Sequence, residues 1–551
     1  MSVDRVACVP ADERGTAGYA GTARDADDLI AGLTAEPWGQ VSPSVYETGR
    51  LVTLTPWLAG HVRRVEYLVA TQRPDGAWGG PDGYALVPTL SATEAILTTL
   101  RCGTSDVVMG AHHAELTGAA VRGIRVLRQR LGEARVSTLP DMPAIELIVP
   151  SLVASVNRHL DSLGDTPVSG LEGLHGTGRL RLPAGMREAP LAAIRARLGS
   201  GATVPQKLMH AIEVVGGDAR RVRTIRPEVT GTVGASPAAT AAWLGEAPPA
   251  SDDPARRYLE AVVGRYGGPV PCGIPITVFE RAWVIGWLVR GGGRPSVPAE
   301  LVESLAAAIE PVGASAAAGL PPDADTTAGA LYALSLLGVP RKPDVLWAYE
   351  TDTHFCTWHG EDGLSVSTNA HVLEAFGQSL STGAGRLGSA SRYAATVAKV
   401  ASWLREMQES DGSWLDRWHA SPYYATACCA LALDHFDRAR SELAVRQAVR
   451  WVLATQRTDG SWGRWVGTAE ETAYAMHVLL LARVARDEAW KTAVARGRAV
   501  LLRPAGKSED PPLWHDKDLY LPTAIVRAAV IAALHLAAEV PEMRVQDSES
   551  P

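Results

Sequence analysis

The sequence predicts an all-α fold in which pairs of helices stack around a closed ring. Two observations predict it. Apolar residues recur at helical spacing along most of the chain, and a pattern of amphipathic helix, Gln, Asp-Gly and Trp occurs three times. No clear alternation of apolar and polar residues, the mark of a half-buried strand, interrupts these segments. With 551 residues, the chain suits two or three domains.

The repeats define the outer parts of this fold. In the first, an amphipathic helix leads into Gln72, and Asp-Gly ends it, because Gly76 can adopt the left-handed conformation that caps a helix. Trp78 follows. The other two repeats place their glutamines at 408 and 456, which are 48 residues apart, about the length of a helical hairpin. We expect these Gln and Trp residues to be structural.

Composition narrows the possible functions. The 53 basic and 60 acidic residues give a formal charge of −7, without a basic block for nucleic acid. The first thirty residues are polar and do not form a secretory signal. The best apolar stretch, 524–538, is broken by Arg527 and His535, so we expect no integral membrane span. Six cysteines lack metal-ligand or disulfide-framework spacing, which favours a cytoplasmic protein with reduced thiols.

Two carboxylates stand two residues apart at Asp323 and Asp325, just before an Ala/Leu-rich helical pattern. Taken alone, this placement fits a helix N-cap, because Asp caps helices well and the helix dipole favours negative charge there. A chemical interpretation is also open. Burial raises the pKa of an Asp, and a second carboxylate raises it further, so one of the pair can hold a proton at neutral pH.

The surroundings favour the chemical interpretation. The run Asp323-x-Asp325-Thr-Thr resembles the Asp-x-Asp-Asp signature of class II terpene cyclases, with Thr326 in place of the last Asp, a variant that occurs within the family. The three repeats resemble the QW motifs of the same family, which tie its outer helices together. Further blocks that are similar to bacterial diterpenyl diphosphate cyclases follow in the family's order: 42–48, 84–91, 278–283, 367–371, 418–424 and 512–520.

This resemblance implies two α/α-barrel domains, the βγ terpene cyclase architecture, with one domain inserted into the other. We expect the inserted domain at 41–268. The domain that carries the Asp-x-Asp-Thr-Thr motif then comprises 22–40 together with 269–541. The ends, 1–21 and 542–551, have a composition typical of disorder.

The resemblance also assigns roles at the site. Asp325 matches the family's proton donor to a carbon–carbon double bond, and Asp323 would orient it. His371 and Asn369 lie in the segment that supplies the donor's hydrogen-bond partner, although His371 could instead be a satisfied helix histidine. Aromatic rings can stabilise carbocations, but core packing is equally open for each of them. The candidates are Trp283, Phe355, Trp358, Trp418, Tyr423, Tyr424 and Tyr520.

The diphosphate of the substrate should survive in the product. Class I terpene synthases remove it with metal ions on an Asp-Asp-x-x-Asp motif, and neither Asp27-Asp28 nor Asp252-Asp253 completes that motif. Glu146 matches a family position associated with Mg²⁺ and diphosphate, so Mg²⁺ is the expected cofactor. Lys517 could contact phosphate directly. For both residues, a solvated charge or an ion pair is the alternative.

The leading hypothesis is cyclisation of geranylgeranyl diphosphate to a bicyclic labdane-type diphosphate by a monomer or homodimer. A downstream class I synthase or phosphatase would act on the product. Alternatives are cyclisation of farnesyl diphosphate to drimenyl diphosphate and a squalene–hopene-type cyclase. A zinc prenyltransferase subunit is another, with Cys356 and His359 as its nearest ligand set. A helical scaffold without activity would leave the acid motif unexplained.

Overall fold

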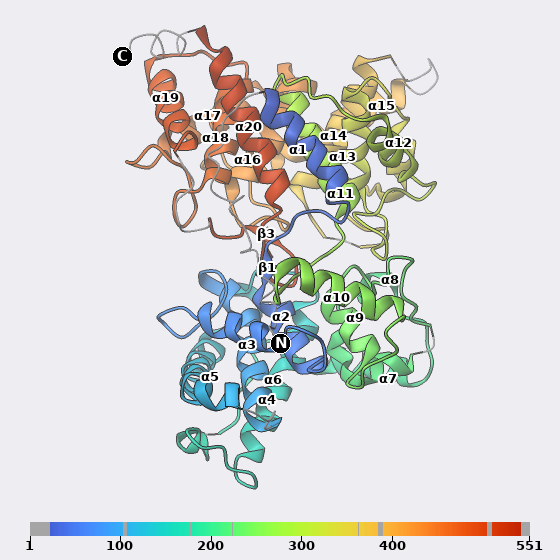
Figure 1. The fold of residues 1–551 in the computed structure, drawn as a ribbon. Helices are drawn as coiled ribbons and strands as arrows, with labels where there is room; N and C mark the ends of the chain where they lie inside the picture. The colour runs from blue at the N-terminus through green and yellow to red at the C-terminus, as the bar shows by residue number, and fades with distance from the viewer. Residues whose placement is uncertain are drawn as a thin grey trace, which may run out of the picture.

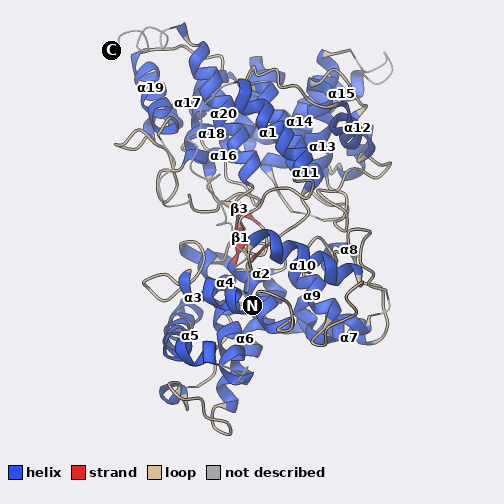
Figure 2. Cartoon of the chain, in the orientation of Figure 1, coloured by secondary structure: helices blue, strands red, loops and turns tan. Residues whose placement is uncertain are grey.

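The computed structural model describes residues 23–102, 107–176, 178–222, 224–361, 363–383, 390–503 and 510–541. It consists of two helical bodies, one above the other, with short strands between them (Figure 1; Figure 2). The strands of the described residues are each two residues long. The prediction of an all-α fold is therefore confirmed. The ends for which we predicted disorder, 1–21 and 542–551, lie outside the described residues.

The upper body in Figure 1 is a closed ring of inner helices, each contacting the next, within the described residues. They are α11 (Thr277–Arg290), α13 (Ala324–Leu336), α14 (Val366–Ser381), α16 (Pro422–Phe436), α18 (Ala469–Leu481) and α20 (Thr523–Glu539). Outer helices pack around them: α12 (Ala299–Ala307), α15 (Ala390–Glu406), α17 (Arg438–Ala454) and α19 (Glu488–Leu501). The N-terminal helix α1 (Ala23–Ala35) contacts α11 and α20, so both ends of the described chain belong to this body.

The lower body repeats this plan on a smaller scale. Its ring comprises α2 (Val45–Leu54), α4 (Leu86–Cys102), α6 (Ile145–Ser162), the 3-10 segment η5 (Ile212–Arg221) and α9 (Pro237–Leu244). Its other long helices are α3 (His61–Ala70), α5 (Val107–Glu133), α7 (Ala189–Gly199) and α10 (Pro254–Tyr266). Short helical turns fill the connections of both bodies: η2 (Asp82–Ala85), η3 (Val136–Thr138), η4 (Glu172–Leu174), α8 (Gln206–Met209) and η6 (Pro343–Tyr349).

The chain enters and leaves the lower body through adjacent strands. Strand β1 (Pro43–Ser44) pairs antiparallel with β2 (Val270–Pro271), so the lower domain is inserted between α1 and the remainder of the upper domain. A second hairpin, β3 (Trp514–His515) with β4 (Leu519–Tyr520), lies against β1. The inserted architecture is therefore confirmed, whereas the boundaries 22–40, 41–268 and 269–541 stay a prediction.

The Gln and Trp of each repeat bind backbone carbonyls. Gln72 donates to the carbonyl of Ala119 in the next outer helix at 3.1 Å, and Trp78 donates its indole N–H to Leu68 at the end of its own helix at 2.6 Å. Gln408 and Gln456 reach α17 and α19 in the same way. Each repeat therefore ties one outer helix to the next and caps the helix that precedes it.

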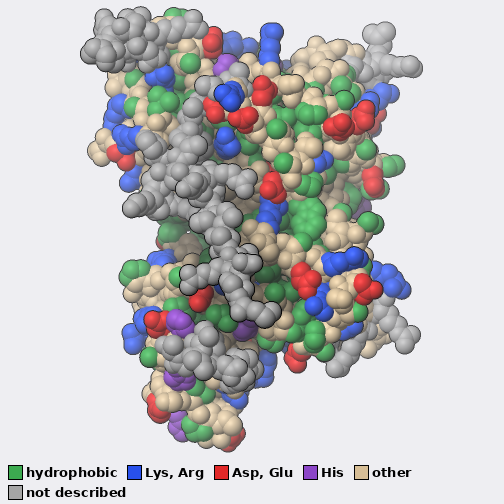
Figure 3. All heavy atoms as spheres, in the orientation of Figure 1, with side chains coloured by type: hydrophobic (Ala, Val, Ile, Leu, Met, Phe, Trp, Pro, Cys, Tyr) green, Lys and Arg blue, Asp and Glu red, His purple; other side chains and the backbone are tan. Residues whose placement is uncertain are grey.

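Carboxylates from other parts of the chain cap several inner helices. Asp416 accepts from the backbone N–H of Ser367 at the start of α14 at 3.2 Å, and Asp510 accepts from Ala469 at the start of α18 at 2.7 Å. Such partners satisfy free N–H groups and complement the helix dipole. Acidic and basic side chains are interspersed on the described part of the face in Figure 3. In the part of the chain that the structure describes, none of the helices is long and apolar enough to span a bilayer.

Candidate active site

The two motif carboxylates occupy the first turn of α13. Asp323 is the N-cap: its backbone is extended, and its Oδ1 accepts from the N–H of Thr326 at 2.5 Å. Asp325 follows inside the helix, where 17% of its side chain is exposed. The capping interpretation and the chemical interpretation are therefore compatible, because Asp323 forms the cap and the carboxyl group of Asp325 takes no part in it.

Asp325 is paired with His371 from α14. Its Oδ1 lies 2.8 Å from Nδ1 of His371. Burial lowers the pKa of His371, but the Asp325 carboxylate more than offsets this effect, so the pKa lies well above its ordinary value. The raised pKa favours the protonated imidazole opposite the carboxylate. The contact with Asp325 is present, whereas the catalytic role of His371 stays a prediction.

Asp323 has the raised carboxyl pKa of the pair. Burial, followed by the neighbouring Asp325 carboxylate, raises the pKa of Asp323 to about 8, while the hydrogen bonds from Thr326 oppose this shift. Asp323 is therefore neutral at pH 7. The predicted coupling of two carboxylates is present, and it raises the pKa of Asp323.

Asn369 does not contact Asp325. Its amide donates to the carbonyl of Phe355 and its Oδ1 accepts from the N–H of Phe355, both at 2.9 Å. The assignment of Asn369 as a direct partner of the acid is therefore wrong, because both ends of its side chain are occupied by backbone. Asn369 therefore holds the loop that contains Phe355 and Thr357. In this loop the carbonyl of Thr357 accepts a hydrogen bond at 2.9 Å from the N–H of Ala324, the residue between Asp323 and Asp325.

Aromatic side chains surround the His371 side of this pair. Trp283 meets the His371 ring edge-on, with ring centroids 4.9 Å apart, and donates its indole N–H to Tyr424 at 2.8 Å. Tyr424 in turn packs against Trp514, a ring that sequence reasoning missed because it stood inside a longer family block. Trp283 and Tyr424 are thus brought together beside His371, the partner of Asp325.

Trp358, Trp418 and Tyr423 make other contacts. Trp358 and Trp418 form a half-buried T-shaped pair with centroids 5.1 Å apart, and Arg417 lies over Trp418. Tyr423 packs against Trp451 of the outer helix α17. Its assignment to the substrate wall is wrong, because a ring that faces an outer helix serves packing.

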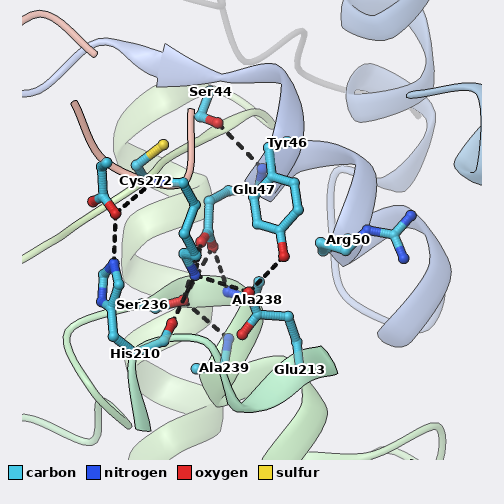
Figure 4. Close-up of polar contacts among 12 residues, drawn as sticks. Ser44, Tyr46, Glu47, Arg50, His210, Glu213, Ser236, Ala238, Ala239 and Cys272 are labelled. Atoms are coloured by element: carbon cyan, nitrogen blue, oxygen red, sulfur yellow. Dashed lines mark hydrogen bonds and ion pairs between the residues drawn. The ribbon is translucent and has the colours of Figure 1, made fainter. Parts of the chain in front are cut away.

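Lys517 is also corrected. Its side chain is fully buried in the inserted domain, where Nζ contacts Glu47 and, at 3.0 Å, Glu213 (Figure 4). Ser236 Oγ and the carbonyl of His210 each lie 2.8 Å away. These partners already use every N–H of the ammonium group, so it has none left for phosphate.

Glu146 lies in the first turn of α6 and is exposed. The preceding Met142 and Ile145 pack with Tyr84 and Leu513, at the seam between the domains. Mg²⁺ needs only one or two carboxylates when diphosphate oxygens and waters complete its shell, so this position fits the ion. No group of three or more potential metal ligands occurs in the described ranges, so the structure offers no zinc set of the transferase type.

Arg417, which sequence reasoning missed, forms ion pairs with both domains at the same seam. Arg417 lies 3.1 Å from Asp141 of the inserted domain and 3.6 Å from Glu361 of the upper domain. Its only sequence signal is its place next to Trp418. The seam beside Glu146 therefore carries both signs of charge.

Comparison with known proteins agrees with this site. Residues 362–523 match the family model of the squalene-hopene cyclase C-terminal domain. The chain is 44% identical over 519 residues to ent-copalyl diphosphate synthase of Streptomyces sp. (strain KO-3988), covering 92% of this chain and 95% of the relative. It is 40% identical over 518 residues to labda-7,13-dienyl diphosphate synthase of Streptomyces clavuligerus, covering 92% and 91%.

A solved structure gives the same answer for the fold. The chain superposes on ent-copalyl diphosphate synthase from Streptomyces platensis with a TM-score of 0.87 and 44% identity, over 94% of this chain and 99% of that one. These likenesses extend over nearly the whole length and leave no place for the transferase or scaffold alternatives. The chain belongs to the bacterial class II diterpene cyclases and is an enzyme of that family.

Proposed function

We propose that this enzyme cyclises geranylgeranyl diphosphate to a bicyclic labdane-type diphosphate. The observation that carries the proposal is the Asp325–His371 pair at the start of α13, in a chain similar to copalyl and labdadienyl diphosphate synthases. A class II cyclase needs a carboxylic acid that can protonate an alkene away from water. Asp325 meets that need, since it is mostly shielded from solvent and has a fixed partner.

The chemistry begins when Asp325, in its carboxylic acid form, transfers its proton to the terminal alkene and becomes a carboxylate. Oδ1 accepts from His371, which leaves Oδ2 to carry the proton toward the substrate. As the proton leaves, negative charge develops on Asp325, and the imidazolium beside it stabilises that charge. The neutral Asp323 adds no competing negative charge to the pair. Together these groups stabilise the carboxylate that is left on Asp325 and hold its side chain in one orientation.

The cation then moves along the folded chain, and nearby ring faces can stabilise it by about 0.5–2 kcal/mol each. Trp283 and Tyr424 are the candidates beside the acid, held to each other by their hydrogen bond. We assign the diphosphate end to the domain seam near Glu146. Mg²⁺ there would neutralise phosphate charge, and Glu146 would supply one carboxylate oxygen to hold it.

The test is incubation of the purified protein with geranylgeranyl or farnesyl diphosphate and Mg²⁺, followed by phosphatase treatment and mass spectrometry. A bicyclic C20 alcohol that forms only after phosphatase supports the proposal. A bicyclic C15 alcohol would instead identify the drimenyl alternative. Stoichiometric release of pyrophosphate would contradict retention of the diphosphate, and with it the expectation that a class I synthase or phosphatase consumes the product.

A further inference from the structure

The β3–β4 hairpin joins the inserted domain to the aromatic cluster beside the acid. In its register Trp514 pairs with Tyr520, and His515 pairs with Leu519. Because side chains alternate along a strand, Trp514 and Tyr520 share one face and His515 and Leu519 share the other. The second face packs on the inserted domain, where His515 contacts the hydroxyl of Tyr84 at 2.9 Å.

The tip of the hairpin is anchored more strongly than its faces. Lys517 enters the inserted domain and contacts Glu47 from α2, Glu213 from η5 and Ser236 at the N-cap of α9. Figure 4 labels these three partners. Its side chain and both carboxylates have at most 1% of their surface exposed. A buried ion pair breaks at high cost when one partner is removed, so this contact fixes the tip.

The residues on either side of Lys517 are anchored as well. Asp516 accepts from His210 at 2.8 Å. Asp518 accepts from the N–H of Tyr46 at 3.2 Å and from the hydroxyl of Ser44 at 3.1 Å. Three consecutive tip residues therefore take their partners from the inserted domain, although they belong to the C-terminal part of the chain.

Trp514, at the base of the hairpin, is connected to the partner of the acid through aromatic contacts. Trp514 donates its indole N–H to Glu470 at 2.7 Å and packs against Phe279 and Tyr424. Tyr424 accepts from Trp283, whose ring meets His371. A continuous series of contacts thus runs from the hairpin to the partner of the general acid.

Tyr520 lies on the same face of the hairpin as Trp514. Burial and then the carboxylate of Asp516 raise the pKa of its phenol, and the carboxylate of Asp325 contributes to the same increase. Its ring lies 6.4 Å from that of Trp514. The hairpin therefore carries two aromatic rings on one face, opposite the face that packs on the inserted domain.

We propose that Lys517 is a positioning residue that, through the β3–β4 hairpin, holds Trp514 against Tyr424 and so sets the position of the rings beside His371. This inference rests on the proposed function. The contact of Lys517 with the inserted domain fixes the position of the hairpin, and the hairpin fixes Trp514 against Tyr424. Since cyclisation depends on the placement of the chain at the ångström scale, a looser hairpin changes which cation is quenched.

The test removes the anchor without leaving a charge buried. Lys517→Met alone would strand the two carboxylates, so the informative variant is the combination Lys517→Met, Glu47→Gln and Glu213→Gln, which is neutral and nearly isosteric. The matched control is Arg50→Met with Glu94→Gln. That pair is also buried and also includes a residue of α2, but both partners lie within the inserted domain.

Turnover and products are measured with geranylgeranyl diphosphate well below each variant's Tm. We expect the triple variant to lose about tenfold or more in kcat, with KM changed much less, and to release monocyclic or hydroxylated diphosphates. The control should lose Tm but keep the wild-type product. A folded triple variant with wild-type kcat and product would overturn the proposal, as would equal product changes in the control.

A milder variant covers the case in which the triple variant does not fold. Asp518→Asn loosens the tip without stranding a charge, and it must shift the products in the same direction; an unchanged product ratio there contradicts the positioning role. Failure of the proposed function is distinguishable, because the wild-type enzyme would then not consume geranylgeranyl diphosphate at all.

Discussion

Nδ1 of His371 lies 2.8 Å from Oδ1 of Asp325, and the two residues come from adjacent inner helices, α14 and α13. The proton donor, Asp325, is thus held against the imidazolium of His371, whose position is fixed before the reaction starts. The ordering of the imidazolium is part of folding, so it costs nothing when negative charge develops on Asp325. This arrangement gives the pair consequences for both rate and pH dependence.

Replacement of the acid should abolish cyclisation without unfolding the protein. An amide cannot donate a proton to an alkene, so Asp325→Asn should lose at least about 10²-fold in turnover. Product formation is measured by mass spectrometry after phosphatase treatment, and folding by circular dichroism. Asp352→Asn, at an exposed loop position of the same domain, is the control and should keep full activity. Activity within tenfold of wild type would remove Asp325 from its role.

Removal of the imidazole should change the pH profile as well as the rate. The folded pKa of His371 is raised, so the stabilisation of the pair is fully present below the unfolded value of about 6.5 and is lost as pH rises through the folded value. Wild-type kcat should therefore fall on the alkaline side. His371→Ala should be slow at every pH and lack that alkaline limb, with Tm within a few degrees. It should also yield some hydroxylated product, because the smaller side chain admits water. A stable variant with unchanged kcat and product would contradict the pairing.

The acid motif could be predicted from sequence because its chemistry and its helix cap use the same residue type at positions two residues apart. The repeats could be predicted because Gln, Asp-Gly and Trp stand within seven positions of one another in each copy. His371 was found only through resemblance, since α14 shows nothing in its own pattern that sets one buried histidine apart.

Lys517 could not be predicted because its partners lie about 300 and 470 residues away in the chain. A lone Lys beside two Asp residues looks like a solvated, phosphate-binding charge. Its burial follows from the insertion of one domain into another, which brings Glu47 and Glu213 to the hairpin tip. Asn369 was misassigned for a similar reason: its partner is the backbone of Phe355, and backbone partners leave no trace in composition.

Asp323 should make stability depend on pH. Its pKa is about 8 in the folded protein and 3.8 in the reference state, so between these values the folded protein binds more protons and its stability falls as pH rises. Asp323→Asn keeps a good N-cap and removes that dependence. Thermal unfolding between about pH 5 and 8 should show a shallower fall of Tm in the variant. Asp253→Asn, at the partly exposed cap of α10, controls for the loss of a capping carboxylate, and an equal change there would contradict the prediction.

Substitution of Glu146 should weaken the binding of Mg²⁺. Because the side chain is exposed, Glu146→Gln should leave Tm unchanged while it raises the Mg²⁺ concentration needed for half-maximal rate several-fold. Wild-type activity should fall on treatment with a chelator and return with added Mg²⁺. Glu66→Gln, an exposed carboxylate on α3, is the matched control. An identical Mg²⁺ titration for both variants would place the ion elsewhere.

A single methyl group on α13 should disturb the acid site. A Cβ at Gly329 would lie 2.5 Å from the ring of Trp283, and that ring both contacts His371 and donates to Tyr424. Gly329→Ala should therefore displace the indole and cost about 1–3 kcal/mol of stability. Cyclisation should slow by more than the loss of folded protein explains, because the ring beside the acid has moved.

Gly264→Ala is the control: it is also helical but has open space around it, and should gain about 0.5–1 kcal/mol in stability. Denaturant unfolding and steady-state kinetics measure the two effects separately. If Gly329→Ala kept wild-type kcat, the placement of Trp283 beside His371 would have no part in catalysis.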